Sequence, residues 1–355
     1  MVYVAITIFL FFLRYALRNE FQARNQIYYV VFLAIFLLTT YRYQVGCDWY
    51  GYYKLYLRYE DINWLPIAGK VDLLSHAIFD YTQDFGLPYP YAYIPFSIIF
   101  FIGIHILARR QPDPLGFFVL MFPILIINIT MSAVRQGAAI GILCIAITAF
   151  IDRRPFHFAL WVVLASLFHS SAIVFLVLFP FATGRYNHTR LALAAFLAIP
   201  GIILLALSQN VQHVTNIYVA SGREAYGAIF RVGVLALSSF YFFLFVKNKW
   251  RQTFPKEYSI VSIGAIGMVI ALFLVPVSSI ISDRYGYYFI PIQAMIFARL
   301  PYLPFKMNHL LHSAIPYIGI FIVFIVWTQT SWHFKECYLP YKSWIFGLPS
   351  GSILK

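Results

Sequence analysis

Three arginines stand where an anion could be bound beside a membrane. Arg42, Arg135 and Arg284 each lie at one end of a long apolar run rather than inside a charged loop. The planar guanidinium group stays charged and donates two parallel hydrogen bonds, which suits phosphate and diphosphate groups. A charge so close to hydrocarbon is costly and marks a functional site. We therefore expect these arginines to converge on one diphosphate-binding pocket, with Arg223 and Arg231 as weaker candidates.

Each of these arginines also has a structural explanation. Arg135 could reach lipid phosphates, and Arg42 could anchor the end of an apolar run. Arg284 could simply pair with its neighbour Asp283. The small residues that follow Arg135 favour function, because the Gly137 and Gly141 spacing lets another helix approach closely there instead of presenting a large apolar face to lipid.

Two residues could accept a proton. His169 lies within Phe168-His169-Ser170-Ser171, and histidine is the usual proton acceptor near neutral pH. Its alternative role is a hydrogen-bonding group for the neighbouring serines. Asp48 is the other candidate base, and its alternative role is to cap a helix that starts at Trp49.

Aromatic residues crowd the stretch that follows Asp48. Trp49 and Tyr52 could stack on sugar rings, or they could belong to the aromatic belt found at membrane surfaces. Further residues expected at the substrate are Gln136, Asp283, Tyr288 and Tyr341.

The composition shows which kind of molecule must position these residues. The chain of 355 residues is 61% hydrophobic and only 11% charged, which predicts a polytopic all-α membrane protein forming a single domain. Basic cytoplasmic loops and anionic lipid account for the net charge of +13, so no nucleic-acid partner is inferred. The three cysteines lie far apart, with no metal-binding spacing, so neither a metal site nor a disulfide is expected, and no cofactor is predicted.

The apolar runs predict about 11 or 12 transmembrane helices. They are Val2–Leu13, Ile27–Thr40, Tyr91–Leu107, Leu115–Ile129, Ser132–Ile151, Phe156–Phe181, Leu191–Leu207, Ile229–Val246, Ser259–Val275, Tyr285–Ala298 and Ser313–Thr328. With the N-terminus outside, every basic loop falls inside only if residues 156–182 double back. This segment is too short for two full spans, so we expect a re-entrant pair of short helices whose apex at His169 lines a cavity open to the outside.

Two other segments are expected outside. Residues 42–90 form the largest loop, and its helical spacing predicts two interfacial helices, at 48–60 and 71–85. Residues 331–355 form an outside tail.

Taken in order, these motifs resemble a known family. Arg42-x-x-x-Gly46-x-Asp48-x-x-x-Tyr52, Arg135-Gln136, the Phe168–Ser171 apex, Asp283-Arg284-Tyr285-x-x-Tyr288 and the Tyr338–Lys342 tail follow one another as in EpsG-like proteins, which are similar to Wzy-type polymerases of O-antigen, capsule and exopolysaccharide. The pattern departs from the family at Cys47, where a small polar residue is common. It also departs near Val71-Asp72, where the family's usual acidic residue is not evident.

The resemblance implies a fold similar to C-type glycosyltransferases and a reaction at the outer face of the bacterial cytoplasmic membrane. A growing glycan on undecaprenyl diphosphate would pass to a sugar hydroxyl of a lipid-linked repeat unit. The implied partners are these two lipid-linked oligosaccharides, the lipid bilayer and a chain-length regulator protein. Arginines would hold the diphosphate without a metal.

Two other classes stay open. An O-antigen ligase or another polyprenyl-linked glycosyltransferase would use similar chemistry, and a monosaccharide transferase would use an outside carboxylate pair such as Glu60-Asp61. A polysaccharide or lipid transporter would show two symmetry-related halves, and the sequence shows one broken segment with no counterpart.

Overall fold

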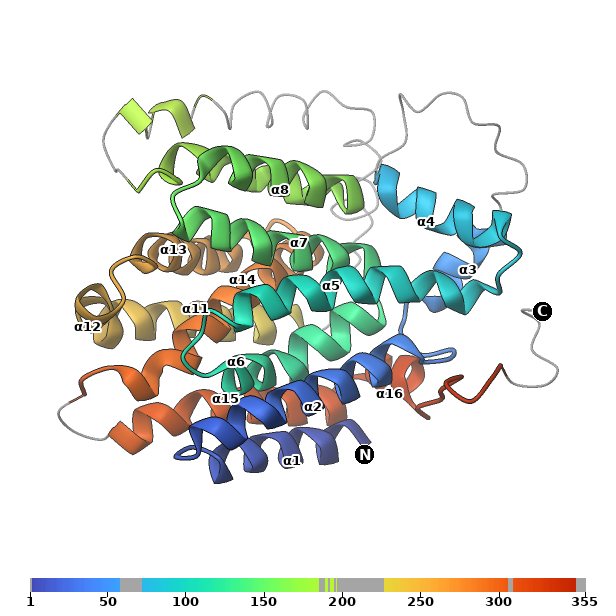
Figure 1. Cartoon of the computed structure of the whole chain (residues 1–355), viewed down its shortest axis with the longest axis horizontal. Coiled ribbons are helices and arrows are strands. Elements are labelled where there is room, and N and C mark those ends of the chain that lie inside the picture. The colour runs from blue at the N-terminus through green and yellow to red at the C-terminus, as the bar shows by residue number, and fades with distance from the viewer. Residues whose placement is uncertain are drawn as a thin grey trace.

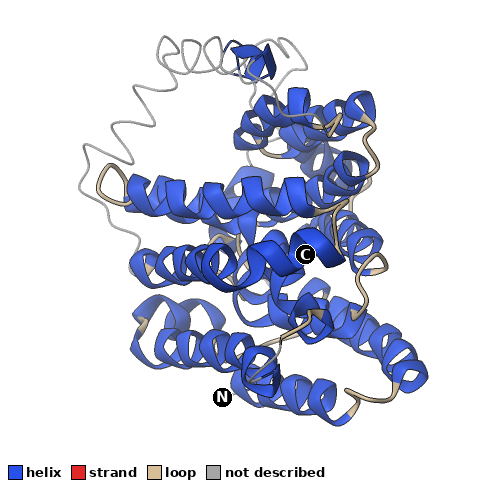
Figure 2. Cartoon of the chain, turned by 90° about the vertical axis from the view of Figure 1, so that its left-hand side faces the viewer, coloured by secondary structure: helices blue, strands red, loops and turns tan. Residues whose placement is uncertain are grey.

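The computed structural model describes residues 2–57, 72–184, 189–190, 192–194, 196, 227–305 and 309–348. Nearly all of this part of the chain is helical, and no strand is named within it (Figure 2). The helices are α1 (Val2–Ala16), α2 (Phe21–Thr40), α3 (Trp49–Leu57), α4 (Leu73–Asp84), η3 (Tyr89–Ala92), α5 (Tyr93–Ala108), α6 (Pro114–Met121), η4 (Phe122–Thr130), α7 (Val134–Ile151), α8 (Pro155–Phe168), η5 (Ser170–Phe181), α11 (Ala228–Tyr241), η7 (Phe242–Val246), α12 (Lys247–Thr253), α13 (Tyr258–Leu274), α14 (Ser279–Arg299), η8 (Leu300–Tyr302), α15 (His309–Thr330) and α16 (Trp332–Tyr338).

The long apolar helices confirm the predicted class of an all-α polytopic membrane protein. Among the described residues, 5 helical segments are long and apolar enough to cross a bilayer: Phe21–Thr40, Tyr89–Ala108, Val134–Ile151, Ala228–Thr253 and His309–Thr330. Most of the helices lie side by side along the long axis of the molecule (Figure 1). The apolar α7 is almost entirely buried at the centre of the bundle.

The segment 156–182 contains two short helical elements, α8 and η5. Helix α8 ends at Phe168, His169 adopts an extended backbone with φ −151°, and η5 begins at Ser170. The two elements run back along each other, since the Phe156 and Phe179 rings are 6.0 Å apart and Gly184 lies against the Arg153 side chain. The chain therefore returns to the end of the bundle from which α8 started.

Two glycines allow α5 and α7 to pack at very short range. A Cβ atom added to Gly103 would lie 1.8 Å from the carbonyl oxygen of Gly141, and one added to Gly141 would lie 2.5 Å from the Cα of Phe100. The predicted close approach of a helix to the small residues of α7 is therefore present at Gly141, and it fixes the position of the α7 start that carries Arg135.

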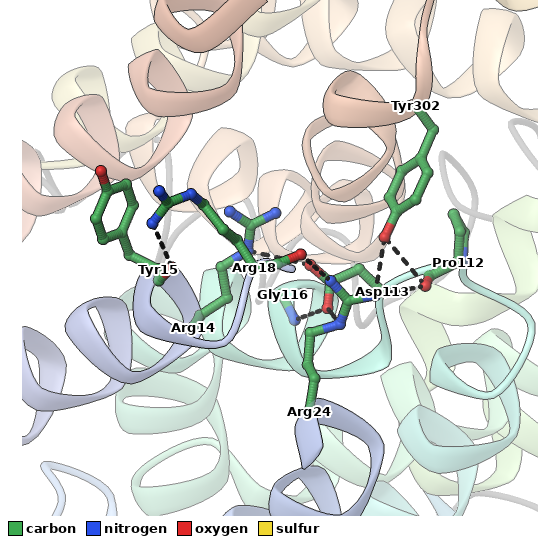
Figure 3. A network of polar contacts seen from close by, with 8 residues as sticks. All are labelled: Arg14, Tyr15, Arg18, Arg24, Pro112, Asp113, Gly116 and Tyr302. Atoms are coloured by element: carbon green, nitrogen blue, oxygen red, sulfur yellow. Dashed lines mark hydrogen bonds and ion pairs between the residues drawn. The ribbon is translucent and has the colours of Figure 1, made fainter. Parts of the chain in front are cut away.

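One end of the bundle carries the predicted cytoplasmic arginines, and their ion pairs join its helices. Fully buried Asp113 lies between Arg14 and Arg24, whose Nε atoms are 3.0 Å and 3.3 Å from its two carboxylate oxygens (Figure 3). Asp113 also accepts a hydrogen bond of 2.9 Å from the Gly116 N–H and so caps α6. A triad of this kind ties α1, α2 and α6 together at a site from which water is excluded.

The opposite end of the bundle carries the two predicted interfacial helices, α3 and α4, together with α16 (Figure 1). The apex at His169 lies at this end too, because Ser75 of α4 donates a hydrogen bond of 2.8 Å to the Phe168 carbonyl oxygen. We call this end of the bundle the outer end and the arginine-rich end the inner end.

Candidate functional site

A cavity of about 250 Å³ lies at the outer end. Its walls come from the loop before α3, the start of α7, the starts of α11 and α14, the end of α15 and α16. The predicted site residues Asp48, Gln136, Asp283 and Arg284 all line it. Three segments that are far apart in sequence thus bring carboxylate, amide and guanidinium groups to one space.

One ion pair forms part of the cavity wall. Arg231 donates from Nε to Asp283 Oδ1 at 2.8 Å and from Nη2 to Oδ2 at 2.7 Å. Asp283 therefore forms a two-point ion pair with Arg231 of α11, whereas the sequence offered its neighbour Arg284 as the partner. Besides this pair, the acidic and basic side chains among the lining residues are those of Asp48, Arg284 and His333.

Gln136 is a deeply buried polar residue of the cavity wall, with 1% of its surface exposed. Its Nε2 donates a hydrogen bond of 2.6 Å to the Arg284 carbonyl oxygen, while its Oε1 is buried without a hydrogen-bond partner in the described structure. A buried acceptor without a partner is costly, so its presence on a cavity wall is typical of a site that receives a ligand donor such as a hydroxyl.

A second polar cluster, centred on Asp72, lies beside the cavity. Asp72 accepts from Arg135 Nη1 at 3.1 Å and from the Ser170 N–H at 2.6 Å, and His169 Nδ1 lies 3.4 Å from its Oδ2. Asp72 has a left-handed backbone with φ 67°, a conformation that aspartate adopts more readily than most residues. The cluster thus joins α4, α7 and the α8–η5 apex through one carboxylate.

These partners change the acidity of Asp72. Burial alone raises its pKa, but the hydrogen bond and charge of His169, the charge of Arg135 and the Ser170 N–H outweigh burial and hold the pKa below its usual range. Asp72 is therefore a carboxylate at neutral pH. The resemblance gave no role to Asp72, whereas the structure places it in contact with both Arg135 and His169.

Tyr52 connects the Asp72 cluster to the cavity. Its ring lies under the Arg135 guanidinium at 5.4 Å. Burial, followed by the charge of Asp48, raises the pKa of Tyr52, whereas Arg135 and Arg284 lower it. Charges from both polar groups therefore act on Tyr52, which is in direct contact with Arg135.

Arg42 does not reach this site. It is fully buried, donates to the carbonyl oxygens of Thr39, Val45 and Met131 at 2.7, 3.1 and 2.9 Å, and stacks on Tyr93 at 4.2 Å. A guanidinium held in this way fixes the turn after α2 against the end of η4. Its predicted role as a diphosphate ligand is therefore replaced by a structural one.

Three predicted substrate-binding aromatic residues also pack within the protein. Trp49 is buried and stacks on Tyr93 with ring centroids 4.9 Å apart. The Tyr341 hydroxyl donates to the Leu38 carbonyl oxygen at 2.8 Å, and the buried Tyr288 hydroxyl lies 2.8 Å from Ser171 Oγ. None of these three rings is among the residues that line the cavity.

A disulfide links Cys47 to Cys337, against the expectation of none. The Cα atoms of this pair lie 4.8 Å apart although 290 residues separate them in the chain. Backbone pairing explains the proximity, because the Gly46 N–H donates to the Cys337 carbonyl oxygen at 2.7 Å. Spacing in the sequence carries no trace of such a contact.

Some predicted residues fall in other parts of the chain. Arg223, the Glu60-Asp61 pair, the run Leu191–Leu207 beyond residue 196 and the tail beyond residue 348 lie outside the described residues. Among the described residues, no group of three or more histidine, cysteine, aspartate or glutamate side chains is placed to hold a metal ion.

The fold and the site together define a polytopic membrane protein with a polar, arginine-containing pocket at one end of its helical bundle. The chain belongs to the EpsG family, whose model matches residues 25–343. Neither a curated protein nor a solved structure matches the chain. Membership of the family points to a polymerase-type glycosyltransferase of polysaccharide biosynthesis.

Proposed function

We propose that this protein is a polysaccharide polymerase that transfers a growing glycan from undecaprenyl diphosphate to a sugar hydroxyl of a lipid-linked repeat unit. The observation that carries the proposal is the outer-end cavity, where Asp48, Gln136 and Arg284 meet beside Arg135. Such a site offers cations for a diphosphate and a carboxylate for a hydroxyl proton, at a membrane surface that two lipid-linked substrates can reach.

The proposed reaction explains why arginines lie at this site, because its leaving group is a diphosphate. As the bond between the sugar anomeric carbon and the diphosphate oxygen breaks, negative charge grows on that oxygen. Arg284 lines the cavity, and Arg135 lies next to it with 29% of its side chain exposed. Guanidinium groups already held in place stabilise this charge without reorganisation. Gln136 Oε1 accepts a hydrogen bond from a sugar hydroxyl and so orients the ring.

In this proposal the Asp48 carboxylate is the base that activates the acceptor hydroxyl. The Asp48 side chain lines the cavity and forms no hydrogen bond or ion pair among the described residues, whereas Asp283 is occupied by Arg231. Asp48 accepts the proton of the attacking hydroxyl as its oxygen bonds to the anomeric carbon, and the electron pair of the broken bond leaves with the diphosphate.

His169 takes a supporting role in this proposal. It lies outside the cavity lining and contacts Asp72, which in turn bonds Arg135. His169 and Asp72 then act as positioning residues that hold the Arg135 guanidinium toward the diphosphate. Replacing His169 is therefore expected to weaken donor use more than it alters the pH profile of transfer.

The site faces the outer side of the bacterial cytoplasmic membrane in this proposal. The support is its place at the end opposite Arg14, Arg24 and Asp113, since basic residues collect on the cytoplasmic side. The bilayer supplies both lipid-linked substrates. A chain-length regulator protein is a further proposed partner.

The test uses a deletion strain complemented with variants, together with purified protein in nanodiscs supplied with lipid-linked repeat units. Loss of the protein is expected to leave products with a single repeat. Asp48→Asn is expected to slow chain extension by about 10²- to 10⁴-fold, the usual contribution of a general base. The matched control Asp84→Asn, on an exposed position of α4, is expected to keep wild-type chain length.

Other outcomes separate the rival functions. Unattached long polymer in the deletion strain indicates a ligase, and repeat units trapped on the cytoplasmic side indicate a transporter. Wild-type extension by Asp48→Asn together with loss in His169→Ala would move the base to His169. Extension that resists a chelator is expected, and rescue of a chelated enzyme by added divalent ion would contradict the arginine-based mechanism.

A further inference from the structure

The outer wall of the cavity is built from the C-terminal part of the chain. Ser331, His333 and Tyr338, on and beside α16, all line the cavity. The Tyr338 hydroxyl donates to Asn128 Oδ1 at 2.8 Å, and Asn128 Nδ2 donates to the Tyr287 hydroxyl. The wall therefore reaches across the cavity to η4 and α14.

This wall depends on contacts with the rest of the chain for its position. Helix α16 has 7 residues, and a helix this short is not stable by itself in water. The buried side chains of Phe334 and Tyr338 attach it to the bundle. The segment that follows forms a backbone ladder with the loop after α2, in which the Tyr43 N–H donates to the Lys342 carbonyl oxygen at 2.9 Å and the Trp344 N–H to the Tyr41 carbonyl oxygen at 2.8 Å. The covalent link between Cys47 and Cys337 stands at the cavity side of this ladder.

Cys47 belongs to the cavity lining, directly before Asp48, and its surface is exposed. A bond from Cys47 to Cys337 therefore fixes the backbone of the proposed base relative to α16. The remaining cysteine, Cys144, is fully buried in the centre of α7 and is free. The two linked cysteines are thus separate from the buried thiol in both position and accessibility.

The location of the pair fits an oxidising compartment. Cys337 belongs to α16 and Cys47 directly precedes Asp48 and α3, and both helices lie at the outer end of the bundle (Figure 1). The arginines that the positive-inside rule assigns to the cytoplasm lie at the inner end. Disulfides form and persist outside the cytoplasm and are rare within it.

We propose that Cys47 and Cys337 form a modification site for an extracytoplasmic thiol–disulfide oxidoreductase, and that the resulting bond closes the outer wall of the cavity and is needed for transfer. The proposal rests on the proposed function for its activity readout. The maturation enzyme is a protein whose own disulfide accepts the electrons.

The chemistry balances as a dithiol–disulfide exchange. The thiolate of the exposed Cys47 attacks the oxidoreductase disulfide and forms a mixed disulfide, with release of one oxidoreductase thiolate. The Cys337 thiolate then attacks the Cys47 sulfur, and the second oxidoreductase sulfur leaves as a thiolate. Two protons and two electrons pass from the pair of cysteines to the oxidoreductase, which becomes a dithiol.

Thiol counting tests the bond without reference to activity. Full-length protein is extracted from membranes under acid quench, denatured and labelled with a maleimide polymer that shifts its gel mobility. The wild-type chain is expected to show one labelled thiol, Cys144, without reductant and three labelled thiols after reduction. The Cys144→Ser chain is expected to show no labelled thiol without reductant and two after reduction. Three labelled thiols without reductant would overturn the proposal. Protein from a host that lacks its extracytoplasmic thiol oxidase is expected to show mostly three labelled thiols without reductant. A single labelled thiol in that host would refute the oxidoreductase step.

Activity tests what the bond does. Cys47→Ser, Cys337→Ser and the double variant are each expected to lower chain extension by about tenfold or more, and equally, because any of them breaks the same link. Cys144→Ser is the matched control and is expected to keep wild-type extension. Wild-type chain length in the double variant would contradict a role of the bond in transfer.

A second measurement decides the matter if the serine variants fail to accumulate. Wild-type protein assembled in nanodiscs is treated with a charged, membrane-impermeant reductant and assayed before and after reoxidation. Reversible loss of extension is expected, and full activity of the reduced protein would refute the proposal. A failed proposed function gives a different pattern, since Asp48→Asn would then extend normally while the thiol count stays at one.

Discussion

The Asp72 cluster gives the sharpest test of how the site is held. Asp72→Asn keeps the shape and one acceptor oxygen, so the Ser170 N–H can still bond. It removes the negative charge 3.1 Å from Arg135 Nη1 and 3.4 Å from His169 Nδ1. The Asp72 side chain is only 6% exposed, so solvent screens these interactions weakly, whereas Arg135 is 29% exposed and can partly rehydrate. A charge-assisted hydrogen bond of this kind contributes about 1.5–3 kcal/mol.

That energy converts into a rate effect through Arg135. An interaction of about 1.5–3 kcal/mol corresponds to about 10- to 150-fold in rate if all of it holds the guanidinium toward the diphosphate. We expect Asp72→Asn to lower the rate of chain extension in nanodiscs by about this factor. Saturating concentrations of the donor lipid should restore only part of the lost rate. Asp84→Asn on the same helix, which is exposed, is the matched control and should have no effect.

A double-mutant cycle separates positioning from a general loss of stability. If Asp72 acts only by holding Arg135, then Asp72→Asn should add little to Arg135→Ala, and the double variant should extend chains at the rate of Arg135→Ala alone. Effects that multiply across the cycle would refute this reasoning. Equal unfolding temperatures of the single variants and wild type in detergent would exclude a folding defect as the cause.

Three further predictions concern stability. Gly103→Ala should lower the unfolding temperature in detergent by the equivalent of about 1–3 kcal/mol, because its Cβ would clash with the Gly141 carbonyl oxygen, whereas Gly51→Ala meets no atom within 4 Å and should be neutral or stabilising. Asp113→Asn should cost about 3–5 kcal/mol and reduce the amount of protein in membranes, because it leaves two buried arginines without their counter-ion, whereas Asp152→Asn at the exposed Arg110 pair should cost about 0–1 kcal/mol; equal membrane levels would contradict this difference. Since the folded-state pKa of Asp72 lies below the ordinary carboxyl value of about 3.9, its stabilising contribution is complete above about pH 4 and is lost as the pH falls through the folded-state pKa; an unfolding-temperature profile from pH 6 to pH 3 should show this loss in wild type and a smaller one in Asp72→Asn.

Local chemistry made much of the site predictable. Asp48, Gln136, Asp283 and Arg284 could be chosen in advance because a polar residue at the end of an apolar run is costly unless it has a use, and the structure brings all four to one cavity. A break near His169 could be proposed from charge counting, which depends only on the order of residues along the chain, and in the structure α8 ends at Phe168 and η5 begins at Ser170.

Other residues could not be assigned in this way. Arg42 and Arg135 look alike in sequence, but Arg42 is enclosed by three carbonyl oxygens and a ring, whereas Arg135 stays partly open. Asp72 carried one available signal, since an acidic residue just before an amphipathic helix is a common cap, but its contacts with α7 and the apex depend on how α4 is placed.

The sequence by itself determined that this chain is a helical membrane protein, where its basic loops lie and which polar residues end its apolar runs, because these properties follow from hydropathy and from residues close together in the chain. Only the tertiary structure decided that Arg42 is enclosed whereas Arg135 stays partly exposed, that Asp283 pairs with Arg231, and that Cys47 meets Cys337 across 290 residues. The physical reason is that burial, ion pairing and cross-linking depend on distances in space, and helix packing sets those distances between segments that share no local pattern.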